Sequence, residues 1–452
     1  MKTDLRFALR SLRRAPAFFC LAVATLGLGI AANTAIFSLF YQVLLRSLPV
    51  QHPEQLVVFH SDRPNMPGRS SSDNGETVFS YPLYLQMRES RSLQGLAARS
   101  STAVQMMVDG VAERGHAEIV SGNFFNVLGI RASAGRLMSP SDDSVRGGNP
   151  VAVLAHEFWK RRFGGSASVL NRTIQLNGQP FAIVGVAPEG FRGILAGDSP
   201  ALFVPISMRA TLNPDWDRYD RPNWQWLTIL GRLAPGVTRE RALAELQPRF
   251  TSVIRAQVDE LNVRNQTARQ RLLAKRLELR PTSQGLNSLE QAWRQPLFVL
   301  LAMVLLLLVI GCANLVNLLM ARAVNRAREI SIRLALGAGR ARVLRLLLTE
   351  SALLAIVGTL TGLLLTPVLT RGILHLLPAN ELGGWLSGEI NLPILGFSML
   401  LMLIATLLFG LLPALQATRT SSALGERTQT TSGGQVHSRS RKIGRASCRE
   451  RV

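Results

Sequence analysis

Cysteine and histidine are scarce in this sequence. Three cysteines and six histidines occur among 452 residues. Two of the cysteines, Cys20 and Cys312, lie inside long apolar stretches, so the chain offers no framework of disulfides. The histidines are scattered, and none has the HExxH spacing of a zinc site. We therefore expect no disulfide-stabilised fold, no metal centre and no bound cofactor.

Motifs of the common nucleotide-binding and hydrolytic sites are also missing. The sequence contains no Walker A loop, no GxSxG elbow and no dinucleotide fingerprint. Residues 337–340, Gly-Ala-Gly-Arg, lack the GK[ST] ending and follow no predicted strand. His116 with Glu118, and His156 with Glu157, could serve as acid and base, but such neighbours are far more often ordinary surface or core residues. The sequence therefore favours a protein that is not an enzyme.

Positive charge and apolar residues are abundant instead. The formal net charge is +22, and 47% of the residues are hydrophobic. A basic soluble protein would first suggest a nucleic-acid partner. Here the arginines stand beside long uncharged stretches, which is typical of the cytoplasmic flanks of membrane helices. We expect a membrane protein that contacts lipid, and no nucleic-acid partner.

Four apolar stretches are long enough to cross a bilayer, which requires about 20 helical residues. They cover residues 17–45, 297–320, 344–369 and 392–415. A basic amphipathic helix over residues 1–16 is expected to lie on the inner membrane surface. A cleaved signal peptide has a similar start, but this apolar run is too long and no clear cleavage site precedes a polar segment. Glu350 can snorkel or pair with Arg345, and it is also a candidate contact site.

The basic residues orient these predicted helices. Lysine and arginine are concentrated before the first helix and in the loop 321–343, whereas the loop 371–391 has one arginine and two glutamates. Loops rich in lysine and arginine stay in the cytoplasm. Both termini of the chain are therefore expected inside the cell. The long segment 49–295, here called the external domain, is expected on the other side.

The external domain has the composition of a globular α+β domain in one or two lobes. Asn177-Gly178 separates two strand-like runs, residues 173–176 and 181–186, and predicts a hairpin. Further strands are predicted near residues 56–59, 103–108, 151–154 and 225–233, and helices at 81–91, 155–163 and 239–265. Tyr219 lies among three tryptophans at positions 216, 224 and 226, where packing in the core is favoured over a ligand platform.

The loop 321–343 contains the most specific motif. Residues 321–340 read ARAVNRAREISIRLALGAGR, a short basic helix followed by a Gly-Ala-Gly break. This resembles the R-x-x-E-[IV]-[GA]-[IV]-[RL]-[RK]-A-[LI]-G-A signature of the FtsX-like permeases, which are membrane subunits of ABC systems of the macrolide-exporter and lipoprotein-release type. Ser331 stands where the family usually has glycine, a mild departure. The resemblance implies a coupling helix that docks on a separate ATPase subunit, with six candidate residues: Arg326, Arg328, Glu329, Arg333, Gly337 and Arg340.

The external domain and the order of segments resemble the same family. Residues 120–136 and 177–188 look like the MacB-like periplasmic core domain, and one span, a large domain and three spans follow in the family's order. Residues 9–16 and 28–38 resemble a branch of duplicated permeases, common in acidobacteria, that have no fused ATPase. The resemblance covers residues 1–427. It implies a multi-pass protein of the bacterial inner membrane and a dimer-like assembly or an internal duplication. A periplasmic adaptor is a further candidate partner.

The C-terminal end does not fit this organisation. Residues 416–442 are typical of a disordered cytoplasmic tail. Residues 443–452, IGRASCRERV, back-translate into a common sequencing-adapter read-through, although a disordered basic tail is the alternative. We therefore expect the natural protein to continue beyond about Arg441 and to repeat the unit of one span, one domain and three spans.

Three functions compete at this point. The leading hypothesis is the permease subunit of an ABC-type efflux or mechanotransmission system that is driven by a separate ATPase. The second is a membrane-anchored sensor or scaffold whose external domain binds a ligand or an envelope partner without transport. The third is a membrane-anchored enzyme, for which no set of catalytic residues is found. The sequence does not identify a substrate, because one fold serves many functions.

Overall fold

The structure is a computed structural model that describes residues 16–62, 78–195, 198–216, 218–286, 288–325, 340–376 and 391–407. By its internal contacts the chain divides into two units. One unit comprises Met1–Phe37, Leu300–Thr370 and Glu389–Val452, and the other comprises Ser38–Val299 and Arg371–Gly388. The expected surface helix before residue 16, most of the loops 321–343 and 371–391, and the tail after residue 407 lie outside the described residues.

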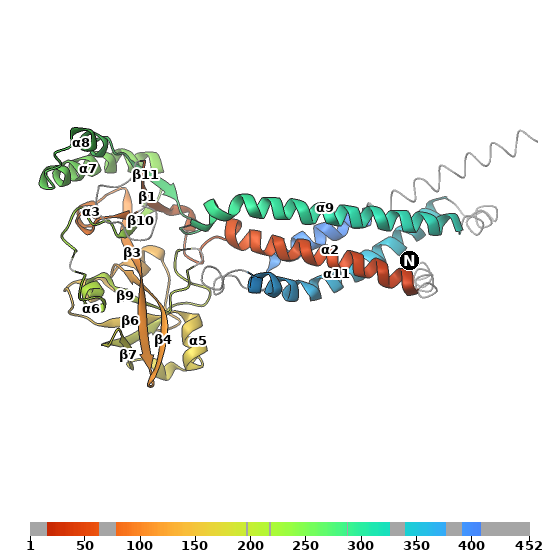
Figure 1. The fold of residues 1–452 in the computed structure, drawn as a ribbon, viewed down its shortest axis with the longest axis horizontal. Coiled ribbons are helices and arrows are strands. Elements are labelled where there is room, and N and C mark those ends of the chain that lie inside the picture. Colours follow the sequence, from red (N-terminus) through yellow and green to blue (C-terminus); the bar gives the residue numbers. More distant parts are fainter. Residues whose placement is uncertain are drawn as a thin grey trace, which may run out of the picture. The chain divides into compact units, whose positions relative to one another are not determined.

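The described chain contains both helices and strands (Figure 1). The helices are α2 (Pro16–Phe40), α3 (Tyr81–Met87), α4 (Phe124–Leu128), α5 (His156–Phe163), α6 (Arg209–Leu212), α7 (Arg239–Glu260), α8 (Gln266–Leu273), α9 (Ser288–Asn325) and α11 (Arg340–Leu376). The strands are β1 (Leu56–Ser61), β2 (Val78–Phe79), β3 (Leu93–Val108), β4 (Val111–Val120), β5 (Ala134–Gly135), β6 (Val151–Leu154), β7 (Thr173–Leu176), β8 (Gln179–Val186), β9 (Leu202–Pro205), β10 (Leu227–Leu233) and β11 (Leu277–Pro281).

Three helical stretches are long and apolar enough to cross a membrane: Pro16–Leu45, Trp293–Ala321 and Thr349–Leu374. They correspond to the first three predicted spans. The fourth prediction, residues 392–415, is described only as an apolar helix over Leu392–Leu407, which is shorter than a full span. In the most apolar part of each helical stretch, 50% is buried in the first stretch and 17% in the second. The first helix therefore lies innermost, and the second keeps most of its apolar surface available to lipid.

Helix α2 packs closely on α11 through glycine, and the two helices run side by side with α9 in Figure 1. A Cβ atom added at Gly358 would lie 2.8 Å from Cβ of Leu26. One added at Gly362 would lie 3.0 Å from the carbonyl oxygen of Gly27. Gly358 and Gly362 form a GxxxG pair, the small-residue spacing that lets two membrane helices approach closely.

Polar side chains also join these helices. Asn33 of α2 is fully buried, and its amide nitrogen donates hydrogen bonds to the carbonyl of Gly29 and, at 2.9 Å, to that of Val304 in α9. The hydroxyls of Thr34 and Ser398 lie 3.1 Å apart, which connects α2 with the helix Leu392–Leu407. Such bonds stabilise helix pairs where no water competes for the polar groups.

The external domain is built on one mixed sheet of 11 strands. The strand order is β11-β1-β10-β3-β4-β9-β6-β8-β5, with β2 added to β10 and β7 added to β3 and β8. Two neighbour pairs are parallel, β4 with β9 and β6 with β8, and the other pairs are antiparallel. The long β3–β4 hairpin crosses the middle of the sheet, and α7 with α8 lies at the β1–β11 end (Figure 1).

Several predicted elements are confirmed and others are wrong in length. The Asn177-Gly178 hairpin is present as β7 and β8, with both turn residues at positive φ. The strand 151–154 is β6, and the helix 155–163 is α5, which ends at left-handed Gly164. The expected helices 81–91 and 239–265 are shorter, and the strand 103–108 is only the end of the 16-residue β3. Strand β4 was not predicted.

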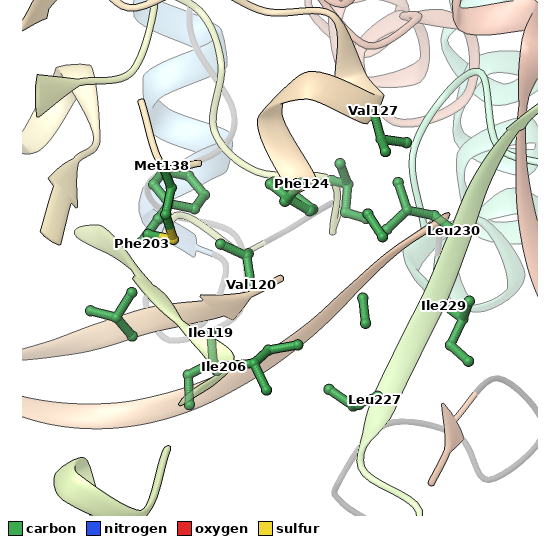
Figure 2. Packing of buried hydrophobic residues seen from close by; sticks show 14 of the residues in the cluster. Ile119, Val120, Phe124, Val127, Met138, Phe203, Ile206, Leu227, Ile229 and Leu230 are labelled. Carbon is green, nitrogen blue, oxygen red and sulfur yellow. The ribbon is translucent and has the colours of Figure 1, made fainter. Parts of the chain in front are cut away.

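The core of the external domain lies between this sheet and the short helices (Figure 2). Phe124 and Phe125 of α4 are fully buried and pack on Phe203 of β9, with the Phe125 and Phe203 ring centroids 5.3 Å apart. Figure 2 also shows Leu230 of β10 on the side of Phe124 and Val127, with Leu227 and Ile229 on the other face of that strand. One continuous core therefore joins β10, β4 and β9, so a displacement at one strand reaches the others through packed side chains.

Candidate functional site: the connectors of the external domain

Five of the six predicted coupling residues lie outside the described residues: Arg326, Arg328, Glu329, Arg333 and Gly337. Arg340 begins α11, but its side chain is not described. Glu350 is half-buried in α11. The described part of the chain instead shows how the external domain is joined to the helices that flank it in sequence.

Two short segments make these joints. The first connector, residues 46–55, runs from the π-helical end Tyr41–Leu45 to β1, and the second connector, residues 281–286, runs from β11 toward α9. They are bonded to each other: the backbone N–H of Leu48 donates to the carbonyl of Ser283 at 2.8 Å. The N–H of Thr282 donates to the carbonyl of Leu56 at 3.1 Å. The two connectors therefore behave as one tied pair.

The second connector is also bonded to the loop that contains residues 191–195. The N–H of Leu286 donates to the carbonyl of Ile194 at 2.6 Å, and Leu195 and Leu286 form a parallel bridge. Gly285 has φ +90°, and a Cβ there would lie 2.5 Å from the Ile194 carbonyl oxygen. Only glycine accommodates both this backbone conformation and this close approach.

The same loop borders a buried ion pair at the centre of the sheet. Nε of Arg99 in β3 lies 2.8 Å from a carboxylate oxygen of Glu118 in β4, and both side chains are at most 3% exposed. Gly193, at φ +86°, leaves space for that carboxylate, because a Cβ there would lie 2.6 Å from Oε2 of Glu118. The ion pair thus joins the central hairpin and contacts the loop that holds the second connector.

A second buried arginine holds the first connector. Arg232 of β10 is 6% exposed, and its guanidinium donates to backbone carbonyls of Gln51 at 2.6 Å and His52 at 3.1 Å. Nε of Arg232 donates to the carbonyl of Val127 in α4 at 2.6 Å, and Nη1 lies 3.4 Å from Oε1 of Gln55. Burial lowers the pKa of Arg232, but arginine remains charged at any physiological pH.

Residues 121–125, part of the segment that resembles the periplasmic core domain, fix the position of α4 beside Arg232. The hydroxyl of Ser121 accepts from the N–H of Ala98, and the amide of Asn123 donates to the carbonyl of Leu96. These bonds hold the turn after β4 against β3, and they place Phe124 and Phe125 in the core. The residues 121–125 therefore fix α4, which supplies the Val127 carbonyl for Arg232.

Arg136 and Asp142 hold the following loop. Their side chains form a two-pronged ion pair with distances of 2.7 and 2.9 Å. Although burial raises the pKa of Asp142, hydrogen bonds from Arg136 and Ser139 hold it below its ordinary value. Asp143 beside it accepts from the N–H groups of Gly122 and Ser207, yet burial keeps its pKa above the ordinary value.

The residue pairs considered as acid and base do not form such sites. His116 is exposed on β4, whereas Glu118 is buried against Arg99. His156 is buried and packs on the Trp159 ring, and Glu157 is exposed. Within the described ranges, no group of three or more histidine, cysteine or acidic side chains could hold a metal ion.

The aromatic cluster is largely part of the core. Trp216, Tyr219 and Trp226 are at most 9% exposed, and their rings lie in edge-to-face contacts. Trp224 is half-buried, and the guanidinium carbon of Arg218 lies 3.6 Å from its ring centre. The packing role predicted for this cluster is therefore the one that the structure shows.

One cavity borders the connectors. It has a volume of about 430 Å³ and lies beside Glu54 of the first connector, Pro281 and Ser283 of the second, and the first turn of α7. Both carboxylates at this cavity, Glu54 and Glu240, are exposed to solvent. The cavity shows that the tied connectors remain open to the surroundings on one side.

Comparisons with known proteins cover both parts of the chain. The MacB-like periplasmic core domain matches residues 19–249, and the FtsX-like permease C-terminal domain matches residues 301–422. The macrolide export ATP-binding/permease protein MacB of Campylobacter jejuni is 24% identical over 305 residues, which are 66% of this chain and 43% of that protein. The protein of that name from Escherichia coli K12 is 27% identical over 301 residues, covering 66% of this chain and 41% of that protein.

The chain also resembles a solved structure. The periplasmic region of MacB from Actinobacillus actinomycetemcomitans is 14% identical, with a TM-score of 0.34, and the match covers 53% of this chain and 92% of that one. The chain spans less than half the length of the curated relatives that it matches. The two family models nevertheless follow each other along the chain in the order of a large domain and a permease segment. The chain therefore belongs to the FtsX-like and MacB-like family of ABC-type permeases.

Proposed function

We propose that this chain is the permease part of an ABC-type efflux or mechanotransmission system in the bacterial inner membrane. A separate ATPase subunit hydrolyses ATP, and its movement enters the chain through the loop 321–343. Family membership and the apolar helices support a multi-pass membrane location. The distribution of lysine and arginine supports four spans, with both termini and this loop in the cytoplasm.

The observation that carries the proposal is the pair of tied connectors. Leu48 and Ser283 are joined by a backbone hydrogen bond, and each connector is held to the sheet by further bonds. A displacement of the helical end Tyr41–Leu45, or of the start of α9, must therefore move strands β1 and β10. Movement of the external domain can then act on a substrate or a periplasmic adaptor without a continuous pore through the helices.

The charges of the coupling loop provide the direct test. The tagged full chain is purified from the membranes of the bacterium that naturally produces it. The co-purifying protein is identified as an ABC ATPase by its sequence and by ATP hydrolysis. We expect Glu329→Lys to lower the amount of bound ATPase about tenfold while membrane insertion stays normal. Glu278 lies on β11 of the external domain with its side chain partly exposed, so Glu278→Lys is the matched control and should leave binding unchanged.

Two outcomes count against the proposal. If Glu329→Lys binds the ATPase as well as the unaltered chain, the loop is not the docking site. If no ABC ATPase accompanies the inserted chain, a sensor or scaffold without transport becomes the better interpretation. A supporting result requires both the loss of binding in the Glu329 variant and normal binding in the Glu278 control.

A further inference from the structure

Arg232 is a buried cation that is satisfied mainly by backbone oxygens. Its guanidinium makes four hydrogen bonds, three of them to the carbonyls of Gln51, His52 and Val127. Among the described residues it forms no ion pair with a carboxylate. A buried charge is costly unless hydrogen bonds compensate for the lost water, so this arrangement is stable only while the carbonyls stay in place.

The acceptors of Arg232 belong to separate parts of the fold. Gln51 and His52 lie in the first connector, at a point where His52 has φ +46° and the backbone is irregular. Val127 lies near the C-terminal end of α4. Gly129 follows α4 with φ +64°, and a Cβ there would lie 2.9 Å from Cβ of Gln51, so the connector also rests closely on this turn.

We propose that Arg232 is the positioning residue that makes the first connector move with β10. The inference rests on the proposed function, because it identifies how displacement passes from the connector into the sheet. The planar guanidinium holds its donors in a fixed fork, and one side chain therefore clamps the connector and α4 at a constant separation. Strand β10 pairs with both β1 and β3, so the movement then spreads to both sides of the sheet.

The first test measures amide hydrogen exchange in the full chain in lipid nanodiscs. We expect Arg232→Met to raise exchange in the first connector at least tenfold, while β3 and β4 keep their protection. Arg232→Lys should be intermediate, because an ammonium supplies three donors without the fixed fork. Arg280→Met is the matched control: this arginine lies on the same sheet, is about half exposed and pairs with Glu278.

Two exchange results would overturn the assignment. Unchanged exchange of the first connector in Arg232→Met would show that the guanidinium does not hold it. An equal rise in exchange throughout the external domain would show that Arg232 only stabilises the fold. Thermal unfolding of the same samples distinguishes the expected local release from a general loss of stability, because a local release leaves the midpoint close to that of the Arg280→Met control.

The second test asks whether the clamp transmits movement. Spin labels are placed at exposed Leu28 of α2 and exposed Gln94 of β3 in a background without native cysteines, with the ATPase partner bound. We expect ATP to change the distance between the labels in the unaltered chain and in Arg280→Met, and to change it by less than half as much in Arg232→Met. A full change in Arg232→Met contradicts the clamp. No change in the unaltered chain contradicts the proposed function, and the exchange measurement then still decides the role of Arg232.

Discussion

Replacement of Glu118 by glutamine tests whether the external domain depends on its buried ion pair. Glu118 and Arg99 are 3% and 1% exposed, and their closest atoms are 2.8 Å apart. Glutamine has nearly the same shape as glutamate, so packing around Gly193 and β3 is preserved. The substitution leaves the guanidinium of Arg99 buried without its carboxylate.

The expected loss of stability follows from the burial. Two unit charges about 4 Å apart attract by roughly 4 kcal/mol at the effective dielectric constant that describes such sites. Breaking one partner of a buried pair costs about 3 to 5 kcal/mol. We therefore expect Glu118→Gln to lower the free energy of unfolding by that amount, which is a large share of the about 5 to 15 kcal/mol typical of a domain.

The assay is chemical denaturation of the detergent-solubilised full chain, followed by tryptophan fluorescence. Trp216 and Trp226 lie in the core and report its opening. Glu278→Gln, which breaks an exposed pair on β11, should cost less than about 1 kcal/mol. The double variant Arg99→Met with Glu118→Leu should recover most of the loss, since buried pairs can be replaced by apolar residues of similar volume. The reasoning is refuted if Glu118→Gln costs no more than the Glu278 control.

Two further predictions concern other parts of the chain. Burial lowers the pKa of Lys275 from 10.5 to about 8, so the folded state binds fewer protons between these values and the free energy of unfolding should rise with pH from about 8 to 10.5. Lys275→Met should remove that rise, and an unchanged pH profile would contradict the assignment. Gly358→Leu should weaken the contact of α11 with Leu26 and lower the thermal midpoint of the solubilised chain. Gly372→Leu is the control and should leave the midpoint unchanged, because a side chain there meets open space. Equal midpoints for the two variants would argue against close packing at Gly358.

Local sequence signals predicted those parts of the fold that depend on neighbouring residues. Asn177-Gly178 specified a hairpin because both residues tolerate positive φ, and the predicted boundaries of β7 agree with the structure. Strand β6 was predicted because four apolar residues follow a polar, turn-forming segment and precede a helix signal. The long apolar runs predicted four membrane helices from their length and hydropathy, and three of these are described as helices long and apolar enough to cross a membrane.

Strand β4 escaped prediction because its outer and inner halves lie in different environments. Its first six residues are mostly exposed and include Glu113, Arg114 and His116, whereas its last four residues are buried and include Glu118. No single alternation describes such a strand. The pairing with β3, through the whole register from Arg99 to Val108, imposes the extended conformation that local propensity does not specify.

The candidate site depends on contacts between residues far apart in sequence, which the sequence alone does not provide. Leu48 and Ser283 meet only because β1 pairs with β11 and brings the two connectors to the same end of the sheet. One sequence signal was nevertheless available. Arg232 interrupts the largely apolar strand β10, and a charge at such a position indicates a buried partner.

The buried contacts of Arg99 and Arg232 differ in kind. Arg99 forms an ion pair with the side chain of Glu118, which a second substitution can alter together with Arg99. Most acceptors of Arg232 are backbone carbonyls, which no substitution removes. Loss of the Arg232 guanidinium therefore leaves buried acceptors that only water or a new donor can satisfy. Position 232 should thus tolerate few replacements, and this restriction falls on the residue that joins the first connector to the sheet.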